Sequence, residues 1–487
     1  MKRSTRWCIS CMANQEENVP TSLFSSLFES SDLQSQNELF IFSSISLSQS
    51  DVDTTGTKAS FIFLYPPRRL SMESYTIFPN CSPEQIDASV SLKRMVFSVG
   101  MCVLPWVWMG FGCKQIILSD SVVQFATLSK DMLDFWSQFY NLVLLEYMYI
   151  HRKYAEMLGP LELLVSNDNV ILMDNKVCRD MKDKSITSGG SSKKVLIPIG
   201  GGKDSIVSWD LSTKQGEDCK LMYVSEETYE FEESWRLQYL SRMMSPYQTQ
   251  IIRNELTDET WLHRKKSYLK PCGMPWAALV AFNAVIIATF EDIPKVILGF
   301  EKSADFGNNV FLRGVEVNHQ YDKSSHFLET FNKYRSDFLV EGVKVESNLQ
   351  NMCDLDIARH FCMEKNLKGF HSTFLSCNVP IGTKWCCECE KCAFLYLILS
   401  AFLEPPDVWG IFGDNLFEKQ DMIPVFNSLL SSKDKPFECV GTAEECTEAL
   451  QRSYEKNISF ISRTHCPGNR ALQVPIVFDA LRECLQR

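Results

Sequence analysis

The chain has 487 residues, which is enough for two or three domains and a large buried core. Its composition, 45% hydrophobic and 22% charged, is that of an ordinary globular protein, and its net charge of -11 argues against general nucleic-acid binding. Nineteen cysteines are scattered without the density of a small secreted scaffold, so we expect a reducing compartment with mostly free or metal-bound thiols.

Residues 1–60 differ in composition from the rest of the chain. They contain fourteen serines and little apolar periodicity, which is typical of a poorly ordered extension. A targeting peptide is the alternative, because Lys2, Arg3 and Arg6 open the chain, although Glu16 and Glu17 are unusual in such peptides. The expected location is therefore cytoplasmic, or plastid if this segment is a transit peptide.

Residues 61–174 are aromatic-rich, and we expect them to form an α+β N-terminal domain. Residues 95–113 carry no charge and are long enough to span a bilayer, but Pro105 and three glycines favour a buried helix, turn and strand. We therefore expect no membrane span. The apolar residues 277–290 indicate a core helix. Residues 175–194 are charged, rich in Ser and Gly, and aperiodic, which is typical of a linker.

A second domain is expected over residues 195–480. Short apolar runs at 195–199, 220–224, 249–252 and 295–298 alternate with helical stretches, which predicts an α/β fold with a doubly wound parallel sheet. Gly200, Gly201 and Gly202 follow the first strand, and Asp204 and Ser205 are good helix-starting residues. A strand, a glycine turn and a helix N-terminus together favour a bound anion, although a tight turn between packed elements is the alternative.

The glycine loop does not match the common phosphate-binding motifs. Asp204 separates Lys203 from Ser205, which excludes a Walker A loop, and position 205 is not the glycine of a dinucleotide fingerprint. GGGKDS instead resembles the pyrophosphate loop of the ATP pyrophosphatase superfamily, whose members split ATP into AMP and pyrophosphate while adenylating a substrate.

Four cysteines are spaced as in a metal site. Cys377, Cys386, Cys389 and Cys392 form C-x8-C-x2-C-x2-C, and four thiolates suit zinc. Free thiols or an iron–sulfur cluster are the alternatives, and nothing else in the chain indicates electron transfer. The same spacing occurs in deazapurine-synthesis members of the ATP pyrophosphatase superfamily, where the zinc is structural.

Residues 297–327 are dense in polar side chains just beyond a predicted strand end. Glu301 and Lys302 come first, and His319 and Lys323 follow within NHQYDKS. Ligands of doubly wound sheets bind at the carboxyl ends of the strands, so these residues are candidates for the site. Any one of them, and Asp322 in particular, can instead be a solvated loop residue.

Taken in order, six motifs resemble the MurL family, the UDP-N-acetylmuramoyl-L-alanyl-L-glutamate epimerases. They are GGGKDS, CGMPWAALVAFN, EKSADFGNN, VNHQYDKS, KWCCECEKCAF and KPFECVGTAEE, and the resemblance covers about residues 59–480. It implies an adenine-nucleotide alpha-hydrolase (PP-loop ATP pyrophosphatase) type of fold with a separate N-terminal domain. It also implies ATP-dependent inversion of an L-glutamyl residue to D-glutamyl, with release of AMP and pyrophosphate.

The implied cofactors and substrates are ATP, Mg²⁺, a structural Zn²⁺ and the UDP-linked muramoyl dipeptide. The amides of Gly200, Gly201 and Gly202, with Lys203, are expected to hold pyrophosphate, and Asp204 and Ser205 to position Mg²⁺ and phosphate. We expect His319 and Lys323 to form the acid–base pair and Glu301 and Lys302 to serve the activated carboxylate or the nucleotide.

Three other functions are compatible with parts of this pattern. The first is an enzyme of the same superfamily that forms an amide or a related product on an adenylated carboxylate. The second is a non-catalytic nucleotide-binding protein. A tRNA-modifying enzyme is disfavoured, because the chain is acidic and lacks a basic stripe interleaved with aromatic residues.

Overall fold

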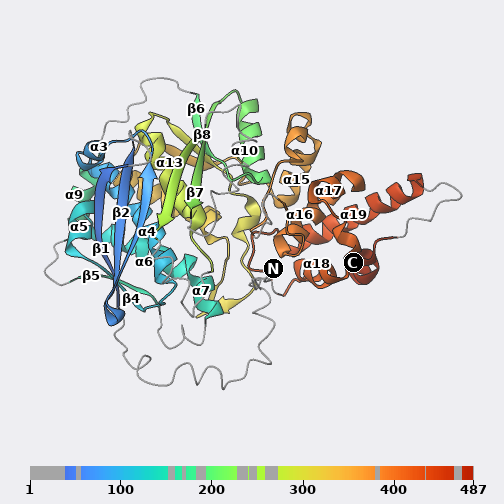
Figure 1. The fold of residues 1–487 in the computed structure, drawn as a ribbon, viewed down its shortest axis with the longest axis horizontal. Coiled ribbons are helices and arrows are strands. Elements are labelled where there is room, and N and C mark those ends of the chain that lie inside the picture. Colours follow the sequence, from blue (N-terminus) through green and yellow to red (C-terminus); the bar gives the residue numbers. More distant parts are fainter. Residues whose placement is uncertain are drawn as a thin grey trace, which may run out of the picture.

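The fold is known from a computed structural model of the chain (Figure 1). The residues that it describes are 39–50, 56–151, 160–166, 172–182, 193–227, 240, 249–257, 272–378, 384–433, 435–464 and 474–485. Residues 1–38, where most of the expected extension lies, fall outside this set.

A mixed sheet of ten strands forms the centre of the fold, in the order β12-β9-β6-β7-β8-β3-β2-β1-β4-β5. The strands are β1 (Leu39–Gln49), β2 (Thr57–Tyr65), β3 (Leu70–Phe78), β4 (Gln115–Leu118), β5 (Glu162–Val165), β6 (Lys194–Pro198), β7 (Asp218–Glu227), β8 (Thr249–Leu256), β9 (Lys295–Leu298) and β12 (Lys344–Ser347). The pairings at β1–β2, β2–β3 and β3–β8 are antiparallel, and the others are parallel.

The four strands predicted beyond residue 194 are confirmed as β6, β7, β8 and β9, and with β12 they form a parallel, doubly wound half-sheet. Alternate residues face opposite cores: Leu196 and Val296 belong to one apolar cluster, whereas Val195 and Ile297 belong to the other. Chain order reverses between β6 and β9, because β7 lies on one side of β6 and β9 on the other. Such a reversal opens a crevice at the carboxyl ends of the two strands.

Helices cover both faces of this half-sheet. On one side α13 (Trp276–Phe290) packs against α4 (Val90–Trp108), and α10 (Lys203–Lys214) and α15 (Asp354–Met363) pack together against the other core. α14 (Ser325–Tyr334) precedes β12. Further helices of the N-terminal region are α3 (Pro83–Asp87), α5 (Asp120–Ala126), α6 (Lys130–Val143) and α7 (Leu145–Ile150). The small hairpin β10 (Phe311–Leu312) and β11 (Val315–Glu316) follows β9.

The remaining helices lie on the side of the half-sheet that α10 and α15 cover, in orange and red in Figure 1. They are α16 (Glu390–Ser400), α17 (Pro405–Phe412), α18 (Ile423–Leu429), α19 (Ala443–Thr464), α20 (Ile476–Ala480) and α21 (Arg482–Leu485). Every residue of α16 is buried, which makes it the centre of this helical region.

Strands from both sides of the domain boundary expected at residues 175–194 belong to the same sheet. β3 pairs with β8, and the side chain of Thr76 lies 2.5 Å from Asn254 Oδ1 across that junction. One apolar cluster contains residues from Phe40 to Val345. The expected separate N-terminal domain is therefore not seen, because strand pairing and a common core join the two regions.

β1 lies inside the segment 1–60 that was expected to be poorly ordered. Phe40 and Phe42 are fully buried, and the serines alternate with apolar residues at the two-residue period of a half-buried strand. The expectation does not hold for residues 39–49, because the serine content masked this alternation.

α4 contains the uncharged segment that raised the question of a membrane span. Among the residues that the structure describes, it is the one helix long and apolar enough to cross a bilayer, and 89% of its most apolar window is buried in the protein. The expected buried helix and turn are confirmed, but the strand begins only at Gln115 and Pro105 does not end the helix. Pro105 has no N–H and cannot donate a hydrogen bond to the Met101 carbonyl four residues earlier. The Tyr140 hydroxyl donates a hydrogen bond to that carbonyl instead, at 2.6 Å. Gly100 allows close packing, because an added Cβ would lie 2.7 Å from the Phe61 ring.

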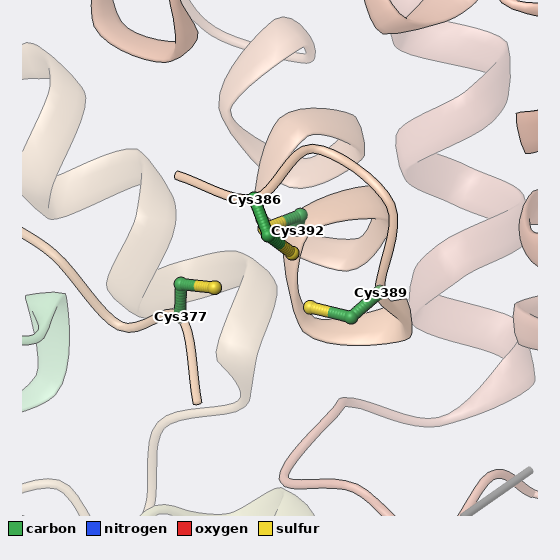
Figure 2. Close-up of side chains that lie close together, drawn as sticks. All are labelled: Cys377, Cys386, Cys389 and Cys392. Atoms are coloured by element: carbon green, nitrogen blue, oxygen red, sulfur yellow. The ribbon is translucent and has the colours of Figure 1, made fainter. Parts of the chain in front are cut away.

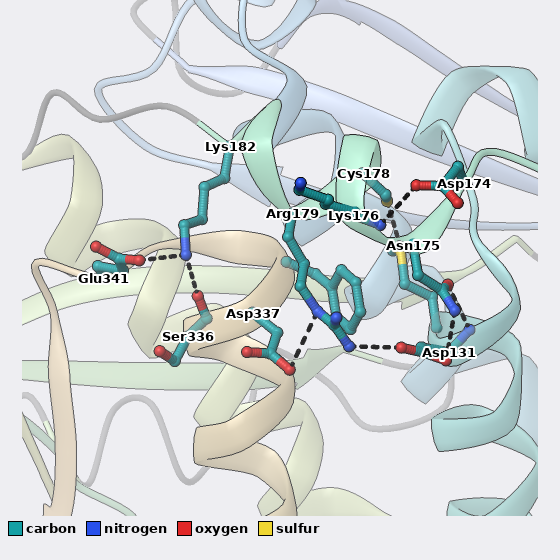
Figure 3. A network of polar contacts seen from close by, with 12 residues as sticks. Asp131, Asp174, Asn175, Lys176, Cys178, Arg179, Lys182, Ser336, Asp337 and Glu341 are labelled. Carbon is teal, nitrogen blue, oxygen red and sulfur yellow. Dashed lines mark hydrogen bonds and ion pairs between the residues drawn. The ribbon is translucent and has the colours of Figure 1, made fainter.

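The expected linker contains a helix, α9 (Asn175–Asp180), with a fully buried Cys178. Figure 3 shows its polar anchors: Arg179 lies 2.5 Å from Asp131 and also contacts Asp337, while Lys182 pairs with Glu341 and donates to the Ser336 carbonyl at 2.7 Å. A charged, aperiodic sequence can therefore be a docked helix when its charges find partners in other elements. Residues 183–192 lie outside the described residues.

Candidate active site

A cavity of about 1020 Å³ opens at the carboxyl ends of β6 and β9 and beside the middle of β7, at the point where strand order reverses. Its walls come from the loop after β6, the start of α13, residues 319–323, the cysteine-rich loop before α16, and residues 437–439. The predicted site residues that line it are Gly200, Gly202, Asp204, Ser205, His319, Lys323, Cys386 and Cys389. The structure therefore brings together the glycine loop and NHQYDKS, which lie far apart in the sequence.

The glycine loop is shaped by close contacts. Gly201 has a φ of +83°, which favours glycine, and its carbonyl accepts a hydrogen bond from the Leu375 amide at 3.1 Å. A Cβ added at Gly202 would lie 2.5 Å from Ser376 Oγ, whereas one at Gly200 would meet nothing within 4 Å. Gly202 is the N-cap of α10 and has no side-chain cap. The first amides of α10 therefore lie beside the cavity, where an anion is favoured.

Lys203 points away from the cavity, which differs from the expectation that it holds pyrophosphate. Its ammonium is almost completely buried and pairs with both Asp204 and Asp354. Burial alone would lower the pKa of Lys203, but the two carboxylates outweigh burial and raise it. A buried ammonium needs such partners, so Lys203 ties the start of α10 to α15.

Glu301 and Lys302 also lie outside the cavity lining. Glu301 is 5% exposed, and its Oε2 has no hydrogen-bond partner among the residues that the structure describes. Burial raises the pKa of Glu301 to about 7. The Lys323 ammonium opposes this shift, and the charges of Asp204 and Asp354 add to it. Lys302 is exposed, because the chain turns into a 3-10 helix after Glu301 and directs neighbouring residues to opposite sides.

His319 and Lys323 line the cavity together. The Nδ1 of His319 lies 2.5 Å from Oε2 of Glu146, a buried residue of α7, and the Nζ of Lys323 lies 3.6 Å from the Cys439 sulfur. Burial by itself would lower the pKa of both cations. For His319, however, the neighbouring Glu146 and Cys439 raise the pKa well above its ordinary value. For Lys323, Cys439 and Glu301 raise it in the same way. Both side chains are therefore cationic near neutral pH.

Asp322 is part of the wall rather than a solvated loop residue. Its Oδ2 accepts hydrogen bonds from the Ala277 amide at 2.7 Å and the Ala278 amide at 3.1 Å. Burial, partly offset by Lys323, raises the pKa of Asp322 to about 6. Asp322 thus fixes the start of α13 against the segment that carries His319 and Lys323.

Two residues with no role predicted from the sequence complete the site. Cys439 lines the cavity, and although burial alone would raise its pKa, Lys323, His319 and Lys391 lower it well below the ordinary value. Glu146 is the single charged residue in the apolar run FYNLVLLEYMY, which is the signal that marks a buried carboxylate with a partner. Cys439 belongs to KPFECVGTAEE, but nothing in that motif alone distinguishes it from the other thiols.

The four predicted metal ligands converge at one place (Figure 2). The sulfurs of Cys377, Cys386, Cys389 and Cys392 all lie within 4.8 Å of one another, and those of Cys386 and Cys392 are 3.6 Å apart. A tetrahedral zinc site with zinc–sulfur bonds of about 2.3 Å has sulfurs roughly 3.8 Å apart, so these residues fit zinc. Cys387 has a φ of +58°, and its thiol faces the Phe412 carbonyl instead.

Two family models match this chain, and together they include most of the residues that line the cavity. The model of the MurL N-terminal domain matches residues 42–345, and that of the MurL C-terminal domain matches residues 373–460. The N-terminal match thus begins in β1 and extends past β9, beyond the boundary expected at residues 175–194.

Two curated relatives carry the name UDP-N-acetyl-alpha-D-muramoyl-L-alanyl-L-glutamate epimerase. The protein from Xanthomonas oryzae pv. oryzae is 28% identical over 268 residues, which are 52% of this chain and 55% of the relative. The protein from a Micromonospora species is 29% identical over 287 residues, 55% of this chain and 58% of the relative. The chain thus spans about half the length of the curated relatives that it matches.

Proposed function

This chain belongs to the MurL family, and on that basis we propose that it is an ATP-dependent epimerase. Its substrate would be UDP-N-acetylmuramoyl-L-alanyl-L-glutamate, whose L-glutamyl residue it would invert to D-glutamyl with release of AMP and pyrophosphate. The observation that carries this proposal is that the loop after β6 and the pair His319 and Lys323 face one cavity. A nucleotide and an acidic α-carbon can thus be held side by side.

The chemistry explains why such an epimerase would need ATP. The α-proton of a glutamyl residue is poorly acidic while the adjacent carboxylate is ionised, because its removal would create a second negative charge. Conversion of that carboxylate to an acyl-adenylate removes the charge and makes the group electron-withdrawing. A protein base can then remove the proton, and hydrolysis after inversion returns the acid.

The proposed nucleotide site is the crevice between β6 and β9. The amides of residues 200–202 and the first turn of α10 would hold the pyrophosphate, and Asp204 and Ser205 would position Mg²⁺. Lys203 would act indirectly, because its pairs with Asp204 and Asp354 hold the first turn of α10 in place. The strand order and the glycine turn support assignment to the PP-loop type of fold.

His319 and Lys323 would supply the positive charge that the reaction needs. Loss of the α-proton places negative charge on the carbonyl oxygen, and cations fixed beside it stabilise that charge. Glu301 would act through Lys323, whose pKa its carboxylate raises, rather than by touching the substrate. Zinc, where bound by the four thiols, would fix the loop before α16 that contributes Cys386 and Cys389 to the wall.

The test is incubation with ATP, Mg²⁺ and the UDP-linked muramoyl dipeptide, followed by chiral analysis of the hydrolysed glutamate. The expected result is D-glutamate with AMP and no change in product mass. All-L glutamate with AMP release would reject this substrate, and a mass change would identify amide or related chemistry instead. If no AMP forms, the catalytic proposal is wrong and a nucleotide-binding role is favoured.

The nucleotide site has its own test in Gly200→Leu. The site of the added side chain is open, so folding should be unaffected, but the leucine would occupy the cavity beside the loop amides. We expect ATP affinity measured by calorimetry to fall at least tenfold, about 1.4 kcal/mol. Gly369→Leu is the control, because it also adds a side chain in open space but away from the cavity.

A further inference from the structure

Cys439 is surrounded by positive charge. The Lys323 ammonium lies 3.6 Å from its sulfur, and the Lys391 ammonium donates to its backbone carbonyl. The His319 imidazole is near enough to lower the pKa of the thiol. All four residues line the cavity. A thiolate is stabilised by neighbouring cations, and the thiolate rather than the thiol accepts a proton.

The proposed epimerisation needs a base, and His319 and Lys323, which the sequence suggests as the acid–base pair, can act only as acids while they are cationic. His319 and Lys323 both already carry a proton near neutral pH, for the reasons given above. Asp204 is paired with Lys203, and Asp322 accepts two backbone amides. Glu438 accepts a hydrogen bond from Asn378 at 2.8 Å, and burial raises its pKa to about 7, so it is partly protonated at neutral pH and is the carboxylate that competes with Cys439 for the role of base.

A second thiol lines the same cavity. Cys272 immediately precedes Gly273, where an added Cβ would lie 3.0 Å from the Glu146 carboxylate. Burial and the Glu146 charge raise the pKa of Cys272 well above its ordinary value, so this thiol keeps its proton. The Glu146 carboxylate also contacts His319, so its charge acts on both Cys272 and the imidazole that lowers the pKa of Cys439.

An independent feature indicates that a ligand contacts this part of the cavity. Gln320 is 1% exposed and lines the wall between His319 and Tyr321, and its Nε2 donates to the Val440 carbonyl at 3.3 Å. Its Oε1 has no hydrogen-bond partner in the described part of the chain. A buried amide oxygen without a donor is costly, so a ligand N–H or O–H is expected beside Cys439.

We propose that Cys439 and Cys272 are the two catalytic residues that exchange protons with the glutamyl α-carbon. The inference rests on the proposed function. The Cys439 thiolate removes the α-proton and becomes a thiol, while the C–H electron pair moves into the activated carboxyl group as an enolate. The Cys272 thiol then donates its proton to the opposite face of the carbon and becomes a thiolate. Proton exchange with water returns both groups to their starting states.

The first experiment separates proton removal from adenylation. In D2O with the L-glutamyl substrate, Cys439→Ala should lose both deuterium incorporation and D-product by at least about 100-fold but still release AMP. Cys272→Ser should incorporate deuterium while the product stays L, because only the second face lacks its donor. Cys219→Ser is the control, since that partly exposed thiol lies outside the cavity. Epimerisation by Cys439→Ala within threefold of wild type would overturn the proposal.

The second experiment needs no substrate. Iodoacetamide labelling of the zinc-loaded protein is followed against pH by peptide mass spectrometry. The labelling rate of Cys439 should rise with an inflection at a lower pH than that of Cys219. The substitution Lys323→Met should move the inflection of Cys439 to higher pH. Equal inflections with no effect of Lys323→Met would overturn the assignment of Cys439, even if the wild type epimerises. A low inflection in a protein that does not epimerise the dipeptide supports the thiolate and rejects the proposed substrate.

Discussion

The Nδ1 of His319 lies 2.5 Å from Oε2 of Glu146, across 173 residues of sequence. Glu146 belongs to α7 in the N-terminal region, whereas His319 lies beyond β9 on the doubly wound half-sheet. The N-terminal region therefore provides part of the cavity's electrostatics. This contact gives a physical reason for the two regions to share a sheet and a core.

Glu146→Gln tests that contact. Removal of the carboxylate charge should lower the pKa of His319 and, through His319, raise that of Cys439. Epimerisation at neutral pH should fall about 10–100-fold and recover in part at higher pH, where more thiolate forms. AMP release should change less. The control is Glu341→Gln, whose carboxylate is 69% exposed, and an unchanged pH profile in Glu146→Gln would contradict the prediction.

Tyr140→Phe tests how α4 tolerates Pro105. The Met101 carbonyl would lose the hydroxyl that donates to it, at a cost of about 1–3 kcal/mol in unfolding free energy. Pro105→Ala restores a backbone N–H for the same carbonyl, so Tyr140→Phe should cost less in that background. Denaturant unfolding of the four proteins of this double-mutant cycle measures the difference. Equal costs in both backgrounds would show that the hydroxyl does not replace the missing N–H.

The cysteine site predicts different behaviour for two adjacent residues. Cys386→Ser should reduce bound zinc from about one equivalent to near zero and lower the melting temperature, because zinc binding is coupled to folding. Cys387→Ser should keep its zinc, because that thiol faces the Phe412 carbonyl. Elemental analysis after dialysis provides the measurement. Loss of zinc from both variants, or from neither, would reject the proposed ligand set.

Glu301→Gln should stabilise the nucleotide-free protein in a pH-dependent way. The pKa of Glu301 is raised from 4.5 to about 7, so its contribution to stability is fully present below pH 4.5 and is lost as the pH rises to 7. At pH 8 the variant should be more stable by on the order of 3 kcal/mol, and at pH 5.5 by roughly half as much. Glu346→Gln, whose carboxylate is 50% exposed, should show no such trend.

Thermal unfolding of both variants across this pH range makes the comparison. A pH-independent difference for Glu301→Gln would mean that the ionised carboxylate is not destabilised by its surroundings. A loss of stability at pH 8 would mean that its charge is required to balance Lys323 and Lys203, which lower the pKa of Glu301.

Features with a short sequence signature were predicted accurately. The strands β6, β7, β8 and β9 were recognised because buried parallel strands are short apolar runs between turn residues. β1 was missed because its serines suggested disorder, and α9 because its charges suggested a linker. In both cases the partners that stabilise the element lie elsewhere in the chain, at β2 and β4 for β1 and at Asp131 and Asp337 for α9.

The sequence by itself determined the glycine turn, the cysteine quartet and the position of NHQYDKS after a strand, because each depends on residues close together in the chain. Tertiary structure decided which of the polar residues face the cavity. It turned Lys203 inward to Asp354, 151 residues away, and placed Cys439 beside Lys323 at a separation of 116 residues. Protonation states depend on the charges and burial within a few ångströms, and only the folded chain brings those groups together.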